Sequence, residues 1–343
     1  MPYVKFGTSR VNDNPSTIWH FGQLPLDEEE IVLVERHRGG AGDIICMRPA
    51  LRFLREKHPG ARLVFRLPTA YHELVADLAD EVLPYEVGEF GHSDSWYFCE
   101  QCEVKGCVKG FYYYHFFCPA GIHEYETNFR PIKNRIENFC DFVGAPYGAP
   151  DLRRLVDVSL VHPELPLEYV LAQMRTAQIS KSWPWDRWAE FCERWKRPPL
   201  VIIDDKPETR EHLEEYKIPF SVYPDTRKDI ILVEGESHKT IAFLTWYARA
   251  VLTCDSYLLH MAGALRSPCV ALFGPTDGNL TCKYYHMTTV IQGTPPPKDS
   301  IRCHAPCYYS TTFNRYWCAG KHGACMRNIS VDEVIAALNA LFE

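Results

Sequence analysis

Short apolar runs alternate with helix-like segments along most of the chain. In the first half, the pattern predicts strands at 31–37, 61–68 and 81–86 and helices between them at 44–57 and 70–79. Nearly continuous apolar strands that alternate with helices are typical of a parallel sheet covered by helices. This half is therefore expected to be an α/β domain.

Residues 90–130 interrupt the alternation with an aromatic, cysteine-rich insertion. A helix is expected after it at 132–144, ended by Gly144. The stretch 145–168 is rich in Pro, Gly and acidic residues, which is typical of a linker.

The alternation begins again after the linker. Strands are expected at 169–175, 199–205, 229–235, 250–255 and 269–274, and helices at 184–195, 207–216, 239–249, 256–265 and 330–342. We predict two Rossmann-like parallel-sheet domains, at 1–160 and 161–300, followed by a cysteine-rich finger and a helix at 301–343. Two such domains that face each other across a cleft would bind a ligand at the carboxyl ends of their strands.

Composition excludes some classes of function. The chain has 343 residues, a formal net charge of −7 and a pI near 6.1, which argues against a protein that coats nucleic acid through a basic face. No apolar run approaches the roughly 18 residues of a membrane span, and the first residues lack the apolar segment of a signal peptide. We expect a cytoplasmic protein with at most peripheral membrane contact.

The first predicted strand runs into Gly39, Gly40, Ala41, Gly42 and then Asp43. The glycines do not complete a dinucleotide fingerprint, because the third glycine position is occupied by another residue, and the Gly-Lys-Ser/Thr of a P-loop is absent. What remains is a tight turn with an acid at a helix N-terminus. Asp43 could be a general base in a ligand cleft, or a residue that caps the helix.

Two stretches together resemble one enzyme family. They are "GAGDIICMRPALRFLREKHPGARLVF" in the first half and "VLTCDSYLLHMAGALRSPCVALFGPTD" in the second. In order and in position they resemble glycosyltransferase family 9, the bacterial heptosyltransferases. The resemblance implies the GT-B architecture, an acceptor-binding first domain, a nucleotide-sugar-binding second domain, and inverting transfer of a heptose-like sugar without a catalytic metal.

The resemblance also implies roles for single residues. Asp43 matches the general base of the family, and Gly40 and Gly42 would leave room for an incoming acceptor. Lys181, in "AQISKSWPWDRW", matches a lysine that contacts the donor. From the residue alone, Lys181 could also be a solvated surface lysine.

Further donor contacts are implied at the second stretch. Asp255, Ser256 and His260 match residues that hold the diphosphate and sugar, and Glu234 ends a strand where a ribose contact would lie. A helix that begins near Ser256 would offer free amides to phosphate. Ser256 could instead be only a cap and His260 a core histidine. Tyr257 departs from the family, which has glycine there, and a tyrosine resists positive φ and close backbone approach.

Cysteine is abundant, and eight of the 14 cysteines fall in two clusters. The C-terminal cluster has the spacing of one tetrahedral site for iron or zinc, and it resembles the four-cysteine iron finger of heptosyltransferases that modify autotransporter proteins. The first cluster could form a second metal site. The clusters are Cys303, Cys307, Cys318 and Cys325, and Cys99, Cys102, Cys107 and Cys118.

The remaining six cysteines are dispersed and are expected in the core. We therefore expect an inverting glycosyltransferase with a structural metal, a donor such as ADP-heptose, an acceptor hydroxyl on lipopolysaccharide core or protein, no nucleic-acid partner, and a possible homo-oligomer. Two alternatives stay open: a non-catalytic binding or assembly protein on the same scaffold, and a cysteine-ligated iron protein.

Overall fold

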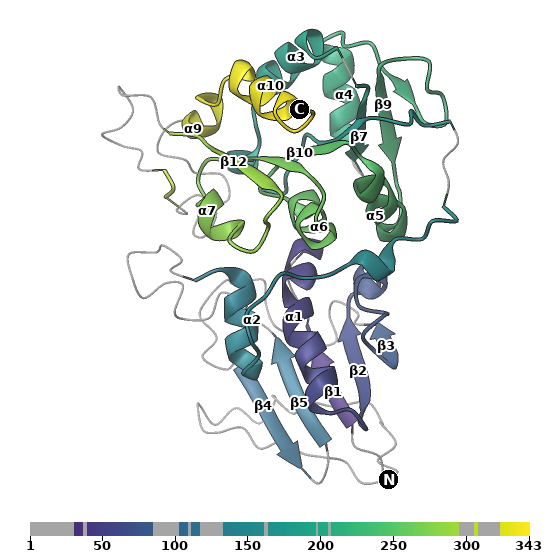
Figure 1. Ribbon diagram of the computed structural model, residues 1–343, viewed down its shortest axis with the longest axis vertical. Helices are drawn as coiled ribbons and strands as arrows, with labels where there is room; N and C mark the ends of the chain where they lie inside the picture. Colours follow the sequence, from purple (N-terminus) through teal and green to yellow (C-terminus); the bar gives the residue numbers. More distant parts are fainter. Residues whose placement is uncertain are drawn as a thin grey trace, which may run out of the picture.

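The computed structural model describes most of the two predicted α/β halves. The described residues are 31–36, 40–84, 103–108, 111–116, 133–160, 164–196, 198–204, 207–294, 305–307 and 323–343, and the side chains of 31, 33, 35, 103–108 and 111–116 are not among them. The two halves lie one above the other in Figure 1.

The first half contains a five-stranded sheet in the order β3-β2-β1-β5-β4. The strands predicted around 31, 61 and 81 are confirmed as β1 (Ile31–Glu35), β2 (Arg62–Leu67) and β3 (Glu81–Pro84), and they pair in parallel. The predicted α/β class is therefore correct for this half.

One expectation for this half is wrong in detail, and the cysteine-rich insertion contains strands that the sequence pattern did not indicate. Within the insertion, β4 (Glu103–Val108) and β5 (Phe111–Phe116) form an antiparallel pair, and β5 pairs in parallel with β1. Its run of aromatic residues is thus a strand inside the sheet. The segment expected as a helix at 70–79 is only a 3₁₀ helix, η1 (Thr69–Leu74).

Two helices of the first half carry residues of the site. Helix α1 (Ala41–Lys57) begins at the glycine-rich turn, three residues earlier than expected. Helix α2 (Arg135–Val143) is capped by Asn134 and Glu137, and it ends at Gly144, which adopts the left-handed conformation with φ 78°. The predicted helix at 132–144 and its glycine end are therefore confirmed.

The second half is a seven-stranded parallel sheet in the order β12-β11-β10-β6-β7-β9-β8. The five predicted strands are confirmed as β6 (Val170–Gln173), β7 (Leu200–Asp204), β9 (Ile230–Glu234), β10 (Ala250–Cys254) and β11 (Cys269–Phe273). The edge strands β8 (Ser221–Val222) and β12 (Thr288–Gln292) were not expected. Both lack the long apolar run that marks a buried strand.

The helices of this half also follow the predicted pattern. Among the described residues they are α3 (Trp185–Arg194), α4 (Pro207–Glu215), α5 (His238–Tyr247), α6 (Tyr257–Leu265) and α10 (Val331–Asn339). The short helices α7 (Gly278–Thr281) and α9 (Ala324–Arg327) were not predicted. Ser330 and Glu333 form the predicted capping box of α10. Within the described parts of the chain, no helix has the length and apolar character needed to cross a bilayer.

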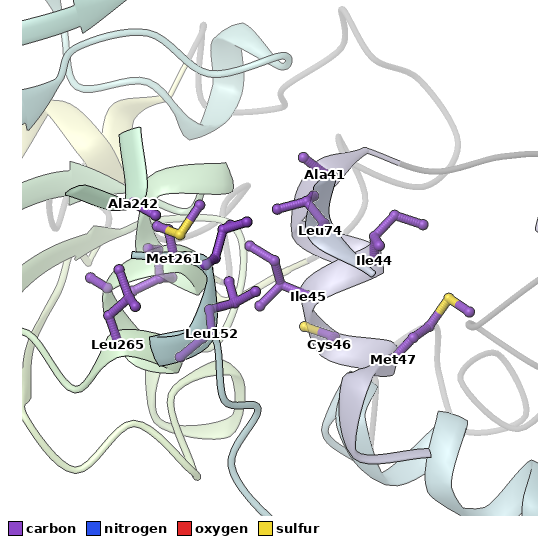
Figure 2. Packing of buried hydrophobic residues seen from close by; sticks show 14 of the residues in the cluster. Ala41, Ile44, Ile45, Cys46, Met47, Leu74, Leu152, Ala242, Met261 and Leu265 are labelled. Carbon is purple, nitrogen blue, oxygen red and sulfur yellow. The ribbon is translucent and has the colours of Figure 1, made fainter. Parts of the chain in front are cut away.

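The two halves meet where α1 packs against α6. Figure 2 shows Ile45 and Cys46 pointing from α1 towards Met261 and Leu152, whereas Ile44 and Met47 point to the opposite side. These residues are at most 2% exposed and belong to one apolar cluster that includes residues of both halves. The hydrophobic effect therefore holds the N-terminus of α1 next to α6.

Candidate functional site

Asp43 lies in the first turn of α1 and uses both carboxylate oxygens. Its Oδ2 accepts a hydrogen bond of 2.9 Å from the backbone N–H of Gly40 and lies 3.6 Å from the Arg36 guanidinium. Its Oδ1 accepts a hydrogen bond from Arg135, the first residue of α2. Asp43 thus completes the helix cap and also lies in a cluster of charges. Its role as a capping residue is therefore compatible with a role as a general base.

The two arginines determine the protonation state of Asp43. Burial raises the pKa of this carboxyl, but the charges of Arg135 and Arg36 and the Gly40 amide outweigh burial and bring the pKa well below its usual range. The side chain of Asp43 is 11% exposed and that of Arg135 is 44% exposed. Asp43 is therefore a carboxylate, not a carboxylic acid, at every physiological pH.

The two glycines of the turn have different surroundings. A Cβ atom at Gly40 would meet nothing within 4 Å. A Cβ atom at Gly42 would lie 2.5 Å from Cδ2 of His260, on α6. The space beside Gly42 is thus filled by a side chain of the other half, and the residue next to the carboxylate at position 43 touches the helix that the sequence predicts to hold the donor.

Lys181 and Asp255 form a second charged group. The Lys181 ammonium donates a hydrogen bond of 2.7 Å to Oδ2 of Asp255, and the Thr276 hydroxyl donates one of 2.8 Å to the same oxygen. Burial raises the pKa of Asp255, but Lys181 outweighs it and lowers the pKa to about 2. Lys181 is 20% exposed and is therefore not a solvated surface lysine.

Ser256 occupies the N-cap position of α6 without capping the helix through its side chain. Its hydroxyl donates a hydrogen bond of 2.7 Å to Oε1 of Gln173, at the end of β6, and that oxygen also accepts from the Leu258 backbone N–H at 3.3 Å. The hydroxyls of Ser256 and Thr253 are 2.8 Å apart. Gln173 therefore fixes Ser256 at the mouth of α6.

Tyr257, the departure from the family motif, is accommodated without backbone strain. It is the first residue of α6 and has no positive φ. Its hydroxyl is 2.8 Å from Nδ1 of His238, the first residue of α5, and the His238 ring lies 6.2 Å from the Tyr71 ring of η1. The Tyr257 side chain therefore lies against His238, where the second half contacts η1 of the first half, and the backbone at the start of α6 is not distorted.

Glu234 ends β9, as predicted, and is paired with a cation. Both of its carboxylate oxygens accept hydrogen bonds from Arg210 on α4. Glu234 is 31% exposed and Arg210 is 42% exposed, so the pair lies at the surface. A ribose hydroxyl would have to share Glu234 with Arg210.

The predicted metal ligands are described only in part. Cys303 and Cys318, and the side chains of all four cysteines of the first cluster, lie outside the described residues. Cys307 and Cys325 lie beside one loop: the Cys307 N–H donates to the Pro275 carbonyl at 2.9 Å, and a Cβ at Gly274 would lie 2.8 Å from the Cys325 sulfur. Among the described residues, no group of His, Cys, Asp and Glu could hold a metal ion.

The other cysteines behave as the sequence predicts. All six dispersed cysteines are at most 8% exposed, namely Cys46, Cys140, Cys192, Cys254, Cys269 and Cys282. Burial raises the pKa of each of these thiols, to about 12 for Cys46. They remain protonated at neutral pH.

Sequence reasoning missed four residues that organise the site: Arg36, Arg135, Gln173 and Thr276. Arg36 directly follows β1, and Arg135 is the first residue of α2. Their places at the ends of elements were only a weak indication that they belong to the site. Gln173 and Thr276 are polar residues at or just after the carboxyl ends of β6 and β11. Ligand sites in parallel sheets form at that edge, which was the available signal.

The model of the family described as glycosyltransferase family 9 (heptosyltransferase) matches residues 161–308. This stretch includes Lys181, Glu234, Asp255, Ser256 and His260. No curated protein is similar enough to the sequence to count as a match.

Solved structures share the fold over nearly the whole chain. The ADP-heptose lipopolysaccharide heptosyltransferase II of Escherichia coli is 17% identical, with a TM-score of 0.59 over 90% of this chain and 98% of that one. The E. coli heptosyltransferase WaaC with ADP-2-deoxy-2-fluoro heptose is 13% identical, with a TM-score of 0.58 over 90% and 99%. The iron-containing dodecameric glycosyltransferase TibC of enterotoxigenic E. coli is 13% identical, with a TM-score of 0.59 over 93% and 78%.

Proposed function

We propose that the chain is a member of glycosyltransferase family 9, the heptosyltransferase family, whose model matches residues 161–308, and that it transfers a heptose-like sugar from a nucleotide diphosphate to an acceptor hydroxyl with inversion. The observation that carries this proposal is the contact of Gly42 with His260. It joins the turn that bears the Asp43 carboxylate to the helix that begins at Ser256, so a base and an anion-binding helix end would meet one ligand.

Asp43 is proposed as the general base. A hydroxyl of the acceptor would give its proton to the carboxylate as its oxygen attacks the anomeric carbon, and the bond from that carbon to the diphosphate would break. The attacking oxygen and the leaving diphosphate are on opposite faces of the sugar, so the configuration inverts. The ionised state of Asp43 supports this role, because the base must be free of its own proton.

Lys181 and the start of α6 are proposed to hold the diphosphate. The Lys181 ammonium and the amides in the first turn of α6 are positive groups that would stabilise the charge on the leaving group. Asp255 accepts hydrogen bonds from both Lys181 and Thr276, and so holds the lysine in place. Asp255 is then a positioning residue for the lysine, and Gln173 has the same role for Ser256.

A panel of nucleotide sugars tests the proposed function. ADP-heptose should bind and release ADP in the presence of acceptor, and UDP- and GDP-sugars should bind at least tenfold more weakly. Calorimetry measures binding, and mass spectrometry of lipopolysaccharide core and of protein acceptors identifies the product. Failure to bind any nucleotide sugar would favour the alternative, a non-catalytic assembly protein on the same scaffold.

We also propose a structural iron or zinc ion at Cys303, Cys307, Cys318 and Cys325, as in the branch of the family that modifies autotransporters. Two of these cysteines support the site, because Cys307 and Cys325 lie beside the neighbouring residues Pro275 and Gly274. Thiolate ligands suit both metals. TibC is iron-containing and dodecameric, and we extend both properties, a metal and a homo-oligomer, to this chain as proposals.

Metal analysis of protein purified without chelator should find about one iron or zinc per chain. Cys307→Ser should lose most of the metal, because a hydroxyl is a poor ligand for either ion. Cys192→Ser is the matched control, since Cys192 is buried in α3 and lies outside both clusters. Equal metal content in the two variants would contradict the site. Labile sulfide in the protein would instead support an iron–sulfur centre, the second alternative.

A further inference from the structure

Three polar side chains from three separate segments meet in the core between the two halves. They are Cys46 of α1, His260 of α6 and Tyr285, which follows α7. The Tyr285 hydroxyl is 2.8 Å from Nδ1 of His260, and the Cys46 sulfur is 3.4 Å from the same nitrogen and 3.7 Å from the hydroxyl. The proposed reaction makes no use of Cys46 or Tyr285.

The cluster is buried and its groups are neutral. Cys46 is 1% exposed and Tyr285 is 3% exposed. Burial raises the pKa of Cys46 to about 12 and that of Tyr285 well above its usual value, so both keep their protons. Burial lowers the pKa of His260 to about 4, so the imidazole carries one proton at neutral pH. Which nitrogen carries that proton is then a question of hydrogen bonding.

The two possible tautomers differ in the bonds they allow. If Nδ1 is unprotonated, it accepts from the Tyr285 O–H at 2.8 Å and faces the Cys46 S–H at 3.4 Å. If Nδ1 is protonated, it donates to Tyr285, whose O–H must then turn to the Cys46 sulfur at 3.7 Å. Sulfur is a weak acceptor, so the first arrangement gives the stronger bonds. It leaves the ring proton on Nε2.

Nε2 lies at the contact with α1. A Cβ at Gly42 would be 3.3 Å from Nε2, and Asp43 is the next residue of the chain. Gly263, which has no side chain, leaves the room that the Tyr285 ring occupies. The ring of His260 is therefore fixed by neighbours on one side and directs its other edge towards the place where the two halves would share a ligand.

We propose that Tyr285, assisted by Cys46, is a positioning residue that holds His260 in the Nε2–H tautomer, so that this N–H donates a hydrogen bond to an oxygen of the nucleotide-sugar donor. The inference rests on the proposed function and extends it. His260 supplies the contact with donor, and Tyr285 determines which nitrogen can make it.

Long-range ¹H–¹⁵N correlation spectra of histidine-labelled protein test the tautomer without any turnover, with the His260→Gln variant used to assign the signal. The wild-type protein should show Nε2–H for His260. Tyr285→Phe keeps the ring and removes the donor, so it should give a mixture of tautomers and roughly a tenfold weaker Kd for ADP-heptose, the cost of about one hydrogen bond to a charged group.

Tyr284→Phe is the control, because the Tyr284 hydroxyl bonds to Glu137 and not to His260. It should leave the His260 signal unchanged. A wild-type signal with the proton on Nδ1, or an unchanged tautomer in Tyr285→Phe, would overturn the inference. A wild-type protein that binds no nucleotide sugar would contradict the proposed function and the donor contact with it, and the spectra would still decide the role of Tyr285 in fixing the tautomer.

Discussion

Asp43→Asn should lower kcat for sugar transfer by roughly 10²- to 10⁴-fold, the usual contribution of a general base. Asparagine has nearly the shape of aspartate and keeps an oxygen that can accept from Gly40, but it cannot take a proton from a hydroxyl. The Kd for donor, measured by calorimetry, should change by less than about threefold, because the groups proposed to hold donor belong to the other half.

The stability of this variant has to be measured beside its activity. Arg36 is 2% exposed and is paired with Asp43, so loss of the carboxylate leaves a buried cation with less compensation. Thermal melting shows whether the variant is folded at the assay temperature. Asp141→Asn is the matched control: Asp141 pairs with Lys133 on the solvent side of α2 and should be dispensable. Full activity of a folded Asp43→Asn enzyme would exclude Asp43 as the base.

The same charges determine the expected pH dependence. The pKa of Asp43 in the folded state is below its unfolded value near 4, so its carboxylate stabilises the fold above pH 4 and loses this effect only as the pH falls through the lower value. His260, with a pKa of about 4, is also neutral above about pH 5. Neither group should then produce an acid limb in kcat/KM between roughly pH 5.5 and 8. A limb centred near pH 6 would contradict the pairing of Asp43 with Arg36 and Arg135.

The sequence allows the second half to be predicted far better than the first. Its strands are buried on both faces and therefore read as uninterrupted apolar runs, such as β10 and β11. In the first half, β5 is marked by aromatic residues next to a cysteine cluster, and local pattern does not reveal that it pairs with a strand 80 residues earlier. Pairing of distant strands depends on the whole chain, not on the segment itself.

The residues of the candidate site also differ in how well the sequence predicts them. Motif residues such as Asp43 and Asp255 could be found because their chemistry and spacing are carried by short segments. Arg135 could not, because its contact with Asp43 joins residues 92 positions apart and depends on how α2 packs beside α1. The two arginines also lower the pKa of Asp43 far more than the dipole of α1 alone would, and nothing in the sequence indicates that they pair with this carboxylate.

Gly42→Ala should lower kcat/KM by roughly 10²-fold, the order expected when a catalytic group is displaced by about 1 Å. The new methyl group would lie 2.5 Å from Cδ2 of His260, and Tyr285 holds that ring from the other side. Either the imidazole or the N-terminus of α1 must then move, and both belong to the proposed site. Overpacking of this kind costs typically 1–3 kcal/mol of stability, which thermal unfolding would record.

Gly60→Ala separates this contact from the general effect of losing a glycine. Gly60 is exposed, lies beyond the C-terminal end of α1 and away from Asp43, and has open space where a Cβ would be, so alanine fits there without touching the proposed site. Its activity should stay within about threefold of wild type. Helix propensity would favour alanine over glycine at position 42 by up to about 1 kcal/mol, because Gly42 lies inside α1. A gain in stability with unchanged kcat/KM in Gly42→Ala would therefore show that propensity outweighs the contact, and that His260 does not need the space which Gly42 provides.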